Sequence, residues 1–279
     1  MTAIELIKML FSTNFAVYAL VGGVAVGLCS ALLGVSLVLK RYSMIGDGLS
    51  HVGFGVMAVA LVIGAAPLAL SIPVVILAAV LLLRISERSS IRGDAAIALI
   101  SSSALAIGVI VISIGGGMNV DISDYMFGSS ILTLTVTDVL ISTLLAVAVT
   151  ALYLIMHNRI FAVTFDESFA AATGNRTGLF NTMIAVLTAV TIVIGMRLLG
   201  ALLVSSLIIF PPLTAMRLCR SYKGVEICSV IVSVVCVVTG IIASFICSVP
   251  TGAAIVVANL AAFVIFQFIA CLRSRVFGR

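Results

Sequence analysis

The chain of 279 residues carries only 25 charged side chains, 15 Lys and Arg and 10 Asp and Glu, which is 9% of the sequence. Hydrophobic residues make up 63%, well above the roughly 45–50% of a soluble domain. A soluble globule of this size could neither bury so much apolar surface nor cover itself with so few charges. The composition predicts a polytopic membrane protein and excludes a disordered chain, a collagen-like fibre and a secreted disulfide scaffold.

Apolar runs alternate with short breaks of charged residues, Gly or Pro, and most runs approach the roughly 20 residues that a membrane-crossing helix needs. The nine runs lie at about 15–39, 46–65, 67–83, 95–114, 132–156, 180–197, 198–216, 225–247 and 252–272. We therefore expect an all-α membrane bundle of eight or nine transmembrane helices, forming one domain over residues 1–279. The sixth and seventh runs are joined almost without a loop, so eight full crossings plus one partial helix remain an alternative.

A few residues inside these runs do not suit an uninterrupted apolar helix. Pro211-Pro212 lies in the seventh run, where we expect a kink or a break unless neighbouring helices satisfy the freed carbonyl groups. Asp138 in the fifth run and Arg197 in the sixth either face a cavity or reach back to the membrane interface.

The basic residues predict the orientation of the bundle. Thirteen of the 15 Lys and Arg residues follow the odd-numbered runs, namely Lys40, Arg41, Arg84, Arg88, Arg92, Arg159, Arg176, Arg217, Arg220, Lys223, Arg273, Arg275 and Arg279. Because basic residues concentrate in cytoplasmic loops, we expect this side to be cytoplasmic, with the N-terminus outside and the C-terminus inside. The net charge of +5 then needs no nucleic-acid partner.

The stretch from Lys40 to Gly55 contains the most informative polar pair, Asp47 and His51. Their i,i+4 spacing places both side chains on one helical face. In a helix running from Arg41, Asp47 lies about 9 Å and His51 about 15 Å along the axis, which puts His51 near the middle of the membrane. Ionisable groups at such depth usually face a pathway, and a carboxylate with an imidazole suits Zn²⁺ or Mn²⁺. A structural Asp–His hydrogen bond between two helices is the alternative.

A predicted inner loop from His157 to Gly178 contains a second feature, the segment Phe165 to Gly174. Asp166 or Ser168 can cap a short helix that ends at Gly174. The small residues at its centre would let a partner pack closely, although an ordinary amphipathic surface helix explains the same pattern.

Several chemistries lack their sequence signals. There is no G-x-x-x-x-G-K-[ST] phosphate loop, no H-E-x-x-H and no G-x-S-x-G, so we expect neither ATP hydrolysis of the P-loop type nor another enzymatic activity. The six cysteines are scattered without a C-x-x-C pair, which argues against a disulfide or zinc framework. We expect no permanently bound cofactor.

Five short segments follow one another along the chain between about residues 15 and 270. They are Ile45-Gly46-Asp47-Gly48-Leu49-Ser50-His51, Gly93 to Ile97, Phe127-Gly128, Asp166 to Gly174, and Leu199 to Val204 followed by Pro211-Pro212 and Ala215. In this order they resemble the permease subunits of bacterial ABC transporters that import zinc, manganese or iron. The first matches the family's G-D-x-x-[SA]-H signature. Many members carry Pro shortly after that His, where this chain has Gly53-Phe54-Gly55.

The resemblance implies a homodimeric permease in the bacterial cytoplasmic membrane. Each copy would dock a separate ATPase, and an extracytoplasmic metal-binding protein would deliver the ion. The residues that match functional positions are Asp47 and His51 on the metal path, and Asp166, Glu167, Ala170 and Gly174 in a coupling segment at about 160–178. Zinc suits the Asp and His pair best, although manganese or iron could use the same pair with waters or groups of the second copy.

Two other functional classes remain. A stand-alone secondary cation transporter could also carry intramembrane carboxylates and broken helices, but it would have no use for an ATPase-docking segment. A membrane scaffold or receptor would explain the hydrophobicity and leave Asp47 and His51 without a role.

Overall fold

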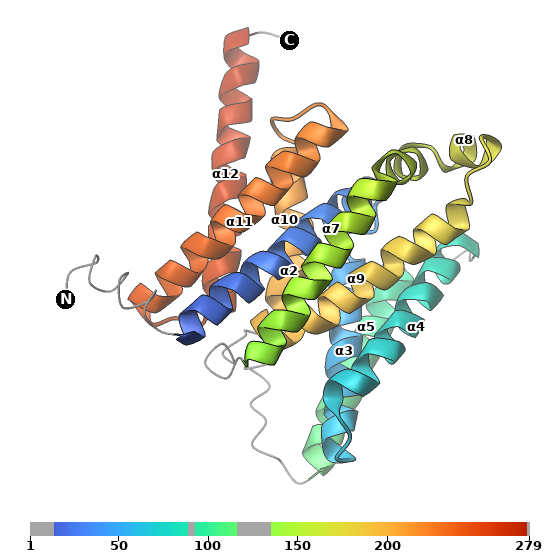
Figure 1. Ribbon diagram of the computed structural model, residues 1–279, viewed down its shortest axis with the longest axis vertical. Coiled ribbons are helices and arrows are strands. Elements are labelled where there is room, and N and C mark those ends of the chain that lie inside the picture. The colour runs from blue at the N-terminus through green and yellow to red at the C-terminus, as the bar shows by residue number, and fades with distance from the viewer. Residues whose placement is uncertain (1–13, 89–92, 116–134, 278–279) are drawn as a thin grey trace.

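A computed structural model describes residues 14–88, 93–115 and 135–277 of the chain, and within these residues the regular structure is entirely helical (Figure 1). The predicted all-α class is therefore confirmed. The helices are α2 (Asn14–Leu39), α3 (Ile45–Val62), α4 (Pro67–Arg88), α5 (Gly93–Ile114), α7 (Val136–Phe165), α8 (Glu167–Ala172), α9 (Thr177–Leu199), α10 (Ala201–Ala215), α11 (Tyr222–Cys247) and α12 (Thr251–Phe277).

Eight of the described helices are long and apolar enough to cross a membrane. The ninth apolar helix, α10, has 15 residues and a length of about 22 Å, which is short of the roughly 30 Å hydrocarbon core. These lengths agree with the alternative of eight full crossings plus one partial helix. Gly200, at φ 93°, ends α9 and separates it from the short α10, where the sequence shows two adjoining apolar runs.

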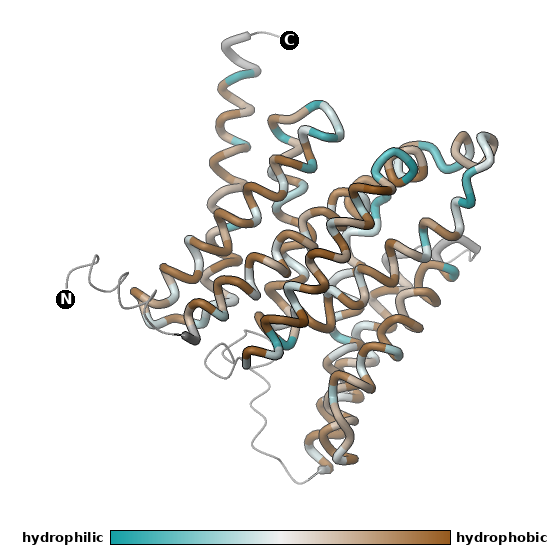
Figure 2. The backbone as a smooth tube through the Cα atoms, viewed as in Figure 1, coloured by the Kyte–Doolittle hydropathy of each residue, from teal (hydrophilic) through white to brown (hydrophobic). Residues whose placement is uncertain are grey.

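The helices form an inner and an outer group. Most residues of α2, α3 and α9 are buried, whereas fewer than a third of those of α4, α5, α7 and α12 are. The short α10 lies at the centre, packed against α2, α12 and α11. Figure 2 shows hydrophobic residues along all the long helices, with hydrophilic ones gathered around α8 and the α10–α11 connection. This distribution suits a bundle surrounded by lipid.

Two glycines allow the backbones of neighbouring helices to approach closely. A Cβ atom on Gly34 of α2 would lie 2.2 Å from the carbonyl oxygen of Ile208 on α10, and one on Gly55 of α3 would lie 2.6 Å from that of Ala104 on α5. Small residues are what membrane helices use for such contacts. Of the outcomes expected at Pro211-Pro212, a break does not occur, since α10 runs through both prolines, which are buried among the neighbouring helices.

The predicted loop after residue 156 is also wrong in its first part, because α7 continues as a helix to Phe165. Ile160 and Val163 are each 1% exposed, and Val163 packs in a cluster with Ala170 and Phe180. One apolar face therefore keeps the segment helical despite its polar residues. The expected marker Phe127-Gly128 lies outside the described residues, as does the side chain of Asp94, although α5 begins at Gly93.

Candidate functional site

The turn between α2 and α3 positions the predicted metal pair. The amide of Tyr42 donates to Leu37 O at 2.8 Å, and that of Arg41 donates to Val38 O at 3.1 Å. Arg41 occupies the left-handed region at φ 63°, the position that glycine usually fills in this helix-ending motif. A non-glycine residue there costs about 1 kcal/mol. This turn ends α2, and a new helix starts at Ile45.

Asp47 and His51 share one face of α3, as the spacing predicts. Asp47 Oδ2 lies 3.7 Å from His51 Nε2, and the two side chains are 42% and 20% exposed. That distance exceeds a hydrogen bond, and both residues belong to one helix, so the pair does not tie two helices together. Because α3 starts at Ile45, Asp47 lies about 3 Å and His51 about 9 Å along it. The pair therefore lies nearer to the start of its helix than expected from a helix starting at Arg41.

Neighbouring helices close off the other faces of α3 around this pair. A Cβ atom on Gly48 would lie 2.6 Å from Ile97 Cγ2 of α5, and one on Gly46 would lie 3.0 Å from Ile208 Cδ1 of α10. Ser50 donates to the carbonyl oxygen of Asp47 at 2.8 Å, and its hydroxyl lies 3.4 Å from that of Ser205 on α10. Ser205 was not predicted as part of this site. The only mark of it in the sequence is that it is one of two adjacent serines in an apolar run.

The pair offers a cation one carboxylate and one imidazole. Within the described residues, no group of three or more His, Cys, Asp or Glu side chains is arranged to hold a metal ion. A closed zinc site uses four ligands, so the two side chains would supply half of such a set, and other groups would have to supply the rest. An incomplete, partly exposed ligand set is suited to passing an ion on rather than storing it.

The predicted short helix is α8, and its ends are those expected. Asp166 is the N-cap, with Oδ1 accepting from the Phe169 amide at 2.9 Å. At the other end Gly174 adopts φ 86°, and the amide of Asn175 donates to Ala170 O at 3.0 Å. Ala170 is fully buried in the contact of α8 with α7 and α9. The cap and the glycine stop therefore have the structural roles that the sequence indicates. Ala170 does not offer the predicted close-packing surface to a partner, because it is buried against α7 and α9 of the same chain.

Glu167 joins α8 to two transmembrane helices, a connection that sequence reasoning missed. Its carboxylate lies 3.6 Å from Lys40 Nζ and accepts from Asn181 Nδ2 of α9 at 2.8 Å. Lys40 also donates to Asn181 Oδ1, and its side chain is only 11% exposed. Lys40 immediately follows α2 and precedes the turn into α3. The three side chains thus link α8 to α9 and to the turn that precedes the helix carrying Asp47 and His51.

Asp138 and Arg197 lie at the opposite end of the bundle from α8, and they pair with each other. Arg197 Nη2 lies 3.2 Å from Asp138 Oδ1. Asp138 Oδ2 also accepts from the amide and hydroxyl of Thr135, which completes a capping box at the start of α7. The carboxylate is therefore committed to a structural role that joins α7 to α9.

A buried polar cluster that the sequence did not reveal joins α2, α7 and α11. The hydroxyl of Tyr153 lies 2.7 Å from that of Tyr222 and 3.1 Å from that of Ser36. Beside them, His157 Nδ1 lies 3.2 Å from Glu226 Oε2. Local sequence carries no signal for these contacts, which join residues far apart in the chain.

An apolar bundle of eight long helices around a short central helix, with a partly exposed Asp–His pair and a tethered helix α8, defines a multi-pass membrane protein. The chain belongs to the ABC 3 transport family, whose sequence model matches residues 12–270. The resemblance inferred from the ordered motifs is confirmed.

Relatives and a solved structure match the chain over almost its whole length. It is 25% identical to the high-affinity zinc uptake system membrane protein ZnuB of Haemophilus influenzae, over 90% of this chain and 95% of the relative. It is 26% identical to the manganese import system permease protein ScaB of Streptococcus gordonii, over 95% of both. The solved structure of PsaBC from Streptococcus pneumoniae in complex with Fab matches with a TM-score of 0.85 and 28% identity, covering 96% of each chain.

Proposed function

We propose that this chain is the permease subunit of an ABC importer that carries a divalent transition-metal ion, zinc or manganese, into the cytoplasm, with residues 1–279 as one permease domain. The observation that carries the proposal is the Asp47 and His51 pair on α3, two side chains that face the same way without a hydrogen bond between them. It occurs in a chain similar throughout to permease proteins of zinc and manganese systems.

Asp47 and His51 act as a transient ligand pair on the translocation path. The carboxylate and the imidazole replace part of the hydration shell of the ion, and water or the same pair of a second copy completes it. Zinc is the preferred cargo because it takes mixed nitrogen and oxygen ligands readily. Manganese prefers oxygen-rich sets, which the pair can also provide when waters fill the remaining positions.

The α8 end of the bundle is the cytoplasmic side. The arrangement that supports this orientation is the concentration of basic residues in the connections at that end, as the positive-inside rule requires. The basic residues there that precede, follow or begin helices include Lys40, Arg41, Arg176, Arg217, Arg220 and Lys223. An extracytoplasmic metal-binding protein then delivers the ion to the opposite face, where α9 meets α10.

A separate ATPase docks on α8, since the chain has no phosphate loop of its own. Phe165 and Phe169 flank Asp166 and Glu167, and both aromatic side chains are more than half exposed. Apolar surface beside a charged helix end is typical of a partner-binding site. Glu167 transmits movement of α8 through Lys40 to the turn that precedes α3. A second copy of the chain completes the core, so that one ATPase docks on each copy.

Metal uptake by the assembled complex tests the proposal. The complex is reconstituted in liposomes with ATP inside, and uptake is measured for zinc, manganese and iron separately. We expect uptake of zinc or manganese by the unchanged chain and none after Asp47→Ala with His51→Ala. The control is His157→Asn, which changes the only other histidine and should leave uptake in place. Normal uptake by the doubly changed complex would exclude the pair from the path.

The competing class, a stand-alone secondary cation transporter, is tested with the same liposomes. If the chain alone moves metal without ATP or partners, the ABC importer proposal is wrong. The tethered helix α8 favours the importer, because a carrier driven by an ion gradient needs no cytoplasmic dock.

A further inference from the structure

We propose that Cys219 and Cys228 form a reversible oxidation site, in which an acidic small-molecule disulfide converts the two thiols into a disulfide bond. Cys219 lies in the connection between α10 and α11, and Cys228 lies on α11. Neither residue belongs to the metal path. The proposal therefore rests on the proposed function only for the cytoplasmic location of the α8 end of the bundle.

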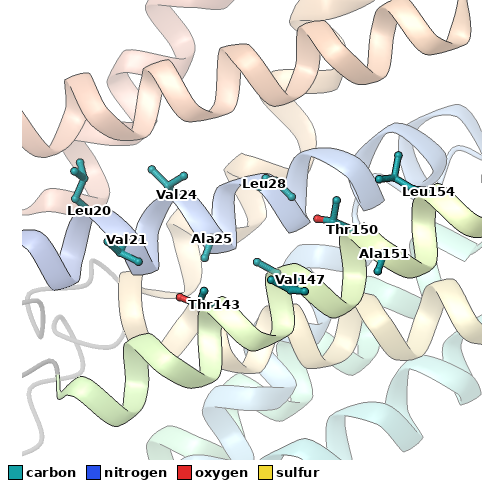
Figure 3. A pocket seen from close by; sticks show the side chains of 11 residues that line it. Leu20, Val21, Val24, Ala25, Leu28, Thr143, Val147, Thr150, Ala151 and Leu154 are labelled. Atoms are coloured by element: carbon teal, nitrogen blue, oxygen red, sulfur yellow. The ribbon is translucent and has the colours of Figure 1, made fainter.

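The membrane-facing groove between α2 and α7 has no side chain in its lining that suits such chemistry. It has a volume of about 740 Å³, and aliphatic side chains line it together with the hydroxyl groups of Thr143 and Thr150 (Figure 3). A hydroxyl group is a weak nucleophile without a neighbouring base. Cysteine thiols differ in this respect, because they exchange with disulfides near neutral pH.

Packing of the α10–α11 connection onto α11 brings two of the six cysteines together. The amide of Cys219 donates to Ala215 O at 2.9 Å, which fixes the connection to the end of α10. A Cβ atom on Gly224 would lie 3.6 Å from Cys219 Cβ and 3.9 Å from its Sγ. Gly224 and Cys228 are spaced i,i+4 and share one face of α11. The face that Cys219 covers is therefore the face that carries Cys228.

The two thiols lie within hydrogen-bonding reach of each other. Both side chains also pack against one small cluster, which consists of Val35, Ala215, Tyr222 and Val225. A disulfide bond needs Cβ atoms about 3.5–4.5 Å apart. Because the thiols already face each other across the connection, a small side-chain rotation brings them to bonding distance.

Basic side chains around Cys219 select the charge of the oxidant. Arg217, Arg220 and Lys223 are exposed, and residues 216–225 contain no Asp or Glu. An electropositive surface raises the local concentration of an anionic reagent. The side chain of Cys219 is partly exposed, so an acidic disulfide such as oxidised glutathione can reach its sulfur.

The oxidation takes two exchange steps. Cys219 gives its proton to water, and its thiolate attacks one sulfur of the small disulfide, whose S–S bond breaks and releases a small thiolate that is protonated by water. Cys228 then loses its proton to water and attacks the Cys219 sulfur, and a second small thiolate leaves and is protonated. Two protein thiols are oxidised, and one small disulfide is reduced to two thiols. An excess of the small thiol reverses both steps.

The location of the pair suits a transient bond. Disulfide bonds in a reducing cytoplasm are usually short-lived and respond to the redox state. The pair therefore stays reduced until small disulfides accumulate. Closure then ties the connection that follows the central helix α10 to α11.

Oxidation of the purified full-length chain by glutathione tests the proposal. The reduced chain in detergent is equilibrated with mixtures of oxidised and reduced glutathione, and the remaining thiols are alkylated. Trypsin then cleaves after Arg220 and Lys223, between the two cysteines, and the peptides are identified by mass spectrometry. We expect the peptides of Cys219 and Cys228 to be joined, and an excess of reduced glutathione to separate them.

The same measurement on denatured chain shows whether the fold contributes. At one fixed glutathione mixture, the ratio of joined to separate peptides should be at least about tenfold higher for the folded chain than in dodecyl sulfate with urea, because the fold raises the effective concentration of one thiol at the other. Equal ratios would overturn the proposal. The measurement involves neither metal nor transport, so its failure and failure of the importer proposal are distinguishable.

Two variants separate the steps. Cys228→Ser removes the second step, so Cys219 should retain glutathione as a mixed disulfide at least about tenfold more than in the unchanged chain. Cys247→Ser, at an exposed cysteine of α11, is the matched control and should leave closure unchanged. A lasting glutathione adduct on the unchanged chain, a disulfide between two copies, or thiols that stay reduced would each overturn the proposal.

Discussion

The chain contains two pairs of a carboxylate and an imidazole, and they differ in almost every physical respect. Asp47 and His51 lie on one helix, 3.7 Å apart and partly exposed. Glu226 and His157 lie on two helices, 3.2 Å apart, with the carboxylate nearly buried beside two tyrosines. The same functional groups therefore occur once in an open and once in an enclosed setting.

The exposure and contacts of each pair decide which role the pair is suited to. The members of the enclosed pair are in direct contact across α7 and α11, so binding an ion there would first require breaking a contact that holds the two helices together. The open pair has no mutual hydrogen bond to lose, and an ion can enter or leave it at little cost. Residue type alone would rank the two pairs equally as metal ligands, and exposure with geometry separates them.

The largest expected effect is on transport, and it should be confined to the open pair. Asp47→Asn with His51→Gln should reduce metal uptake more than about tenfold, since both ligands are weakened at once. The free energy of unfolding should change by less than about 0.5 kcal/mol, as for other exposed sites. Uptake and denaturant unfolding of the same preparation measure both. A strongly destabilised variant would mean that the pair is structural.

The enclosed pair should give the opposite result. Glu226→Ala leaves His157 without its partner, and removing one member of a buried pair typically costs about 3 kcal/mol. The free energy of unfolding of the purified chain should fall accordingly, while metal uptake at low temperature persists. Glu226→Gln, which keeps the shape and one acceptor, is the matched control and should cost less. Loss of uptake in a stable Glu226 variant would contradict this division of roles.

The contact between Lys40 and Glu167 should have an intermediate effect on coupling. Either Lys40→Glu or Glu167→Lys places like charges together and should lower ATP-driven uptake roughly fivefold, the equivalent of about 1 kcal/mol. ATP hydrolysis by the complex should continue. The double exchange restores opposite charges and should recover uptake. If the double variant is no better than the singles, the ion pair does not transmit movement from α8.

The smallest effect is expected at the turn before the open pair. Arg41→Gly relieves a left-handed residue but adds freedom to the unfolded chain, and the two effects nearly cancel. The free energy of unfolding should rise by no more than about 0.5 kcal/mol. Denaturant unfolding measures this change, and Gly178→Ala, at an exposed glycine with nothing within 4 Å of its added Cβ, serves as a reference. A marked loss of stability would mean that the Arg41 side chain itself holds the turn.

Much of the fold follows from local sequence signals. The apolar runs locate the long helices, and Asp166 with Gly174 marks both ends of α8, because capping and left-handed stops depend on residues close in sequence. The shared face of Asp47 and His51 follows from helical spacing alone. Each of these features needs information from only a few neighbouring residues.

The remainder depends on contacts between distant residues. No glycine marks the turn at Arg41 in the sequence. The start of α3, and with it the distance of Asp47 from that start, could therefore not be predicted. The extension of α7 beyond His157 requires the packing of Val163 against Phe180. Glu167 meets Lys40, and Asp138 meets Arg197, only after the helices have assembled. Such pairs carry no periodic pattern, and a single sequence does not reveal them.

The length of α7 has a mechanical consequence. Its 30 residues form a rod of about 45 Å, held at its first turn by Arg197 and continuing at its last residue into the cap of α8. A rod of that length tilted by about 5° about one end displaces the other by about 4 Å. A small rotation of α7 at one membrane surface is therefore amplified into a shift of atomic dimensions at the other.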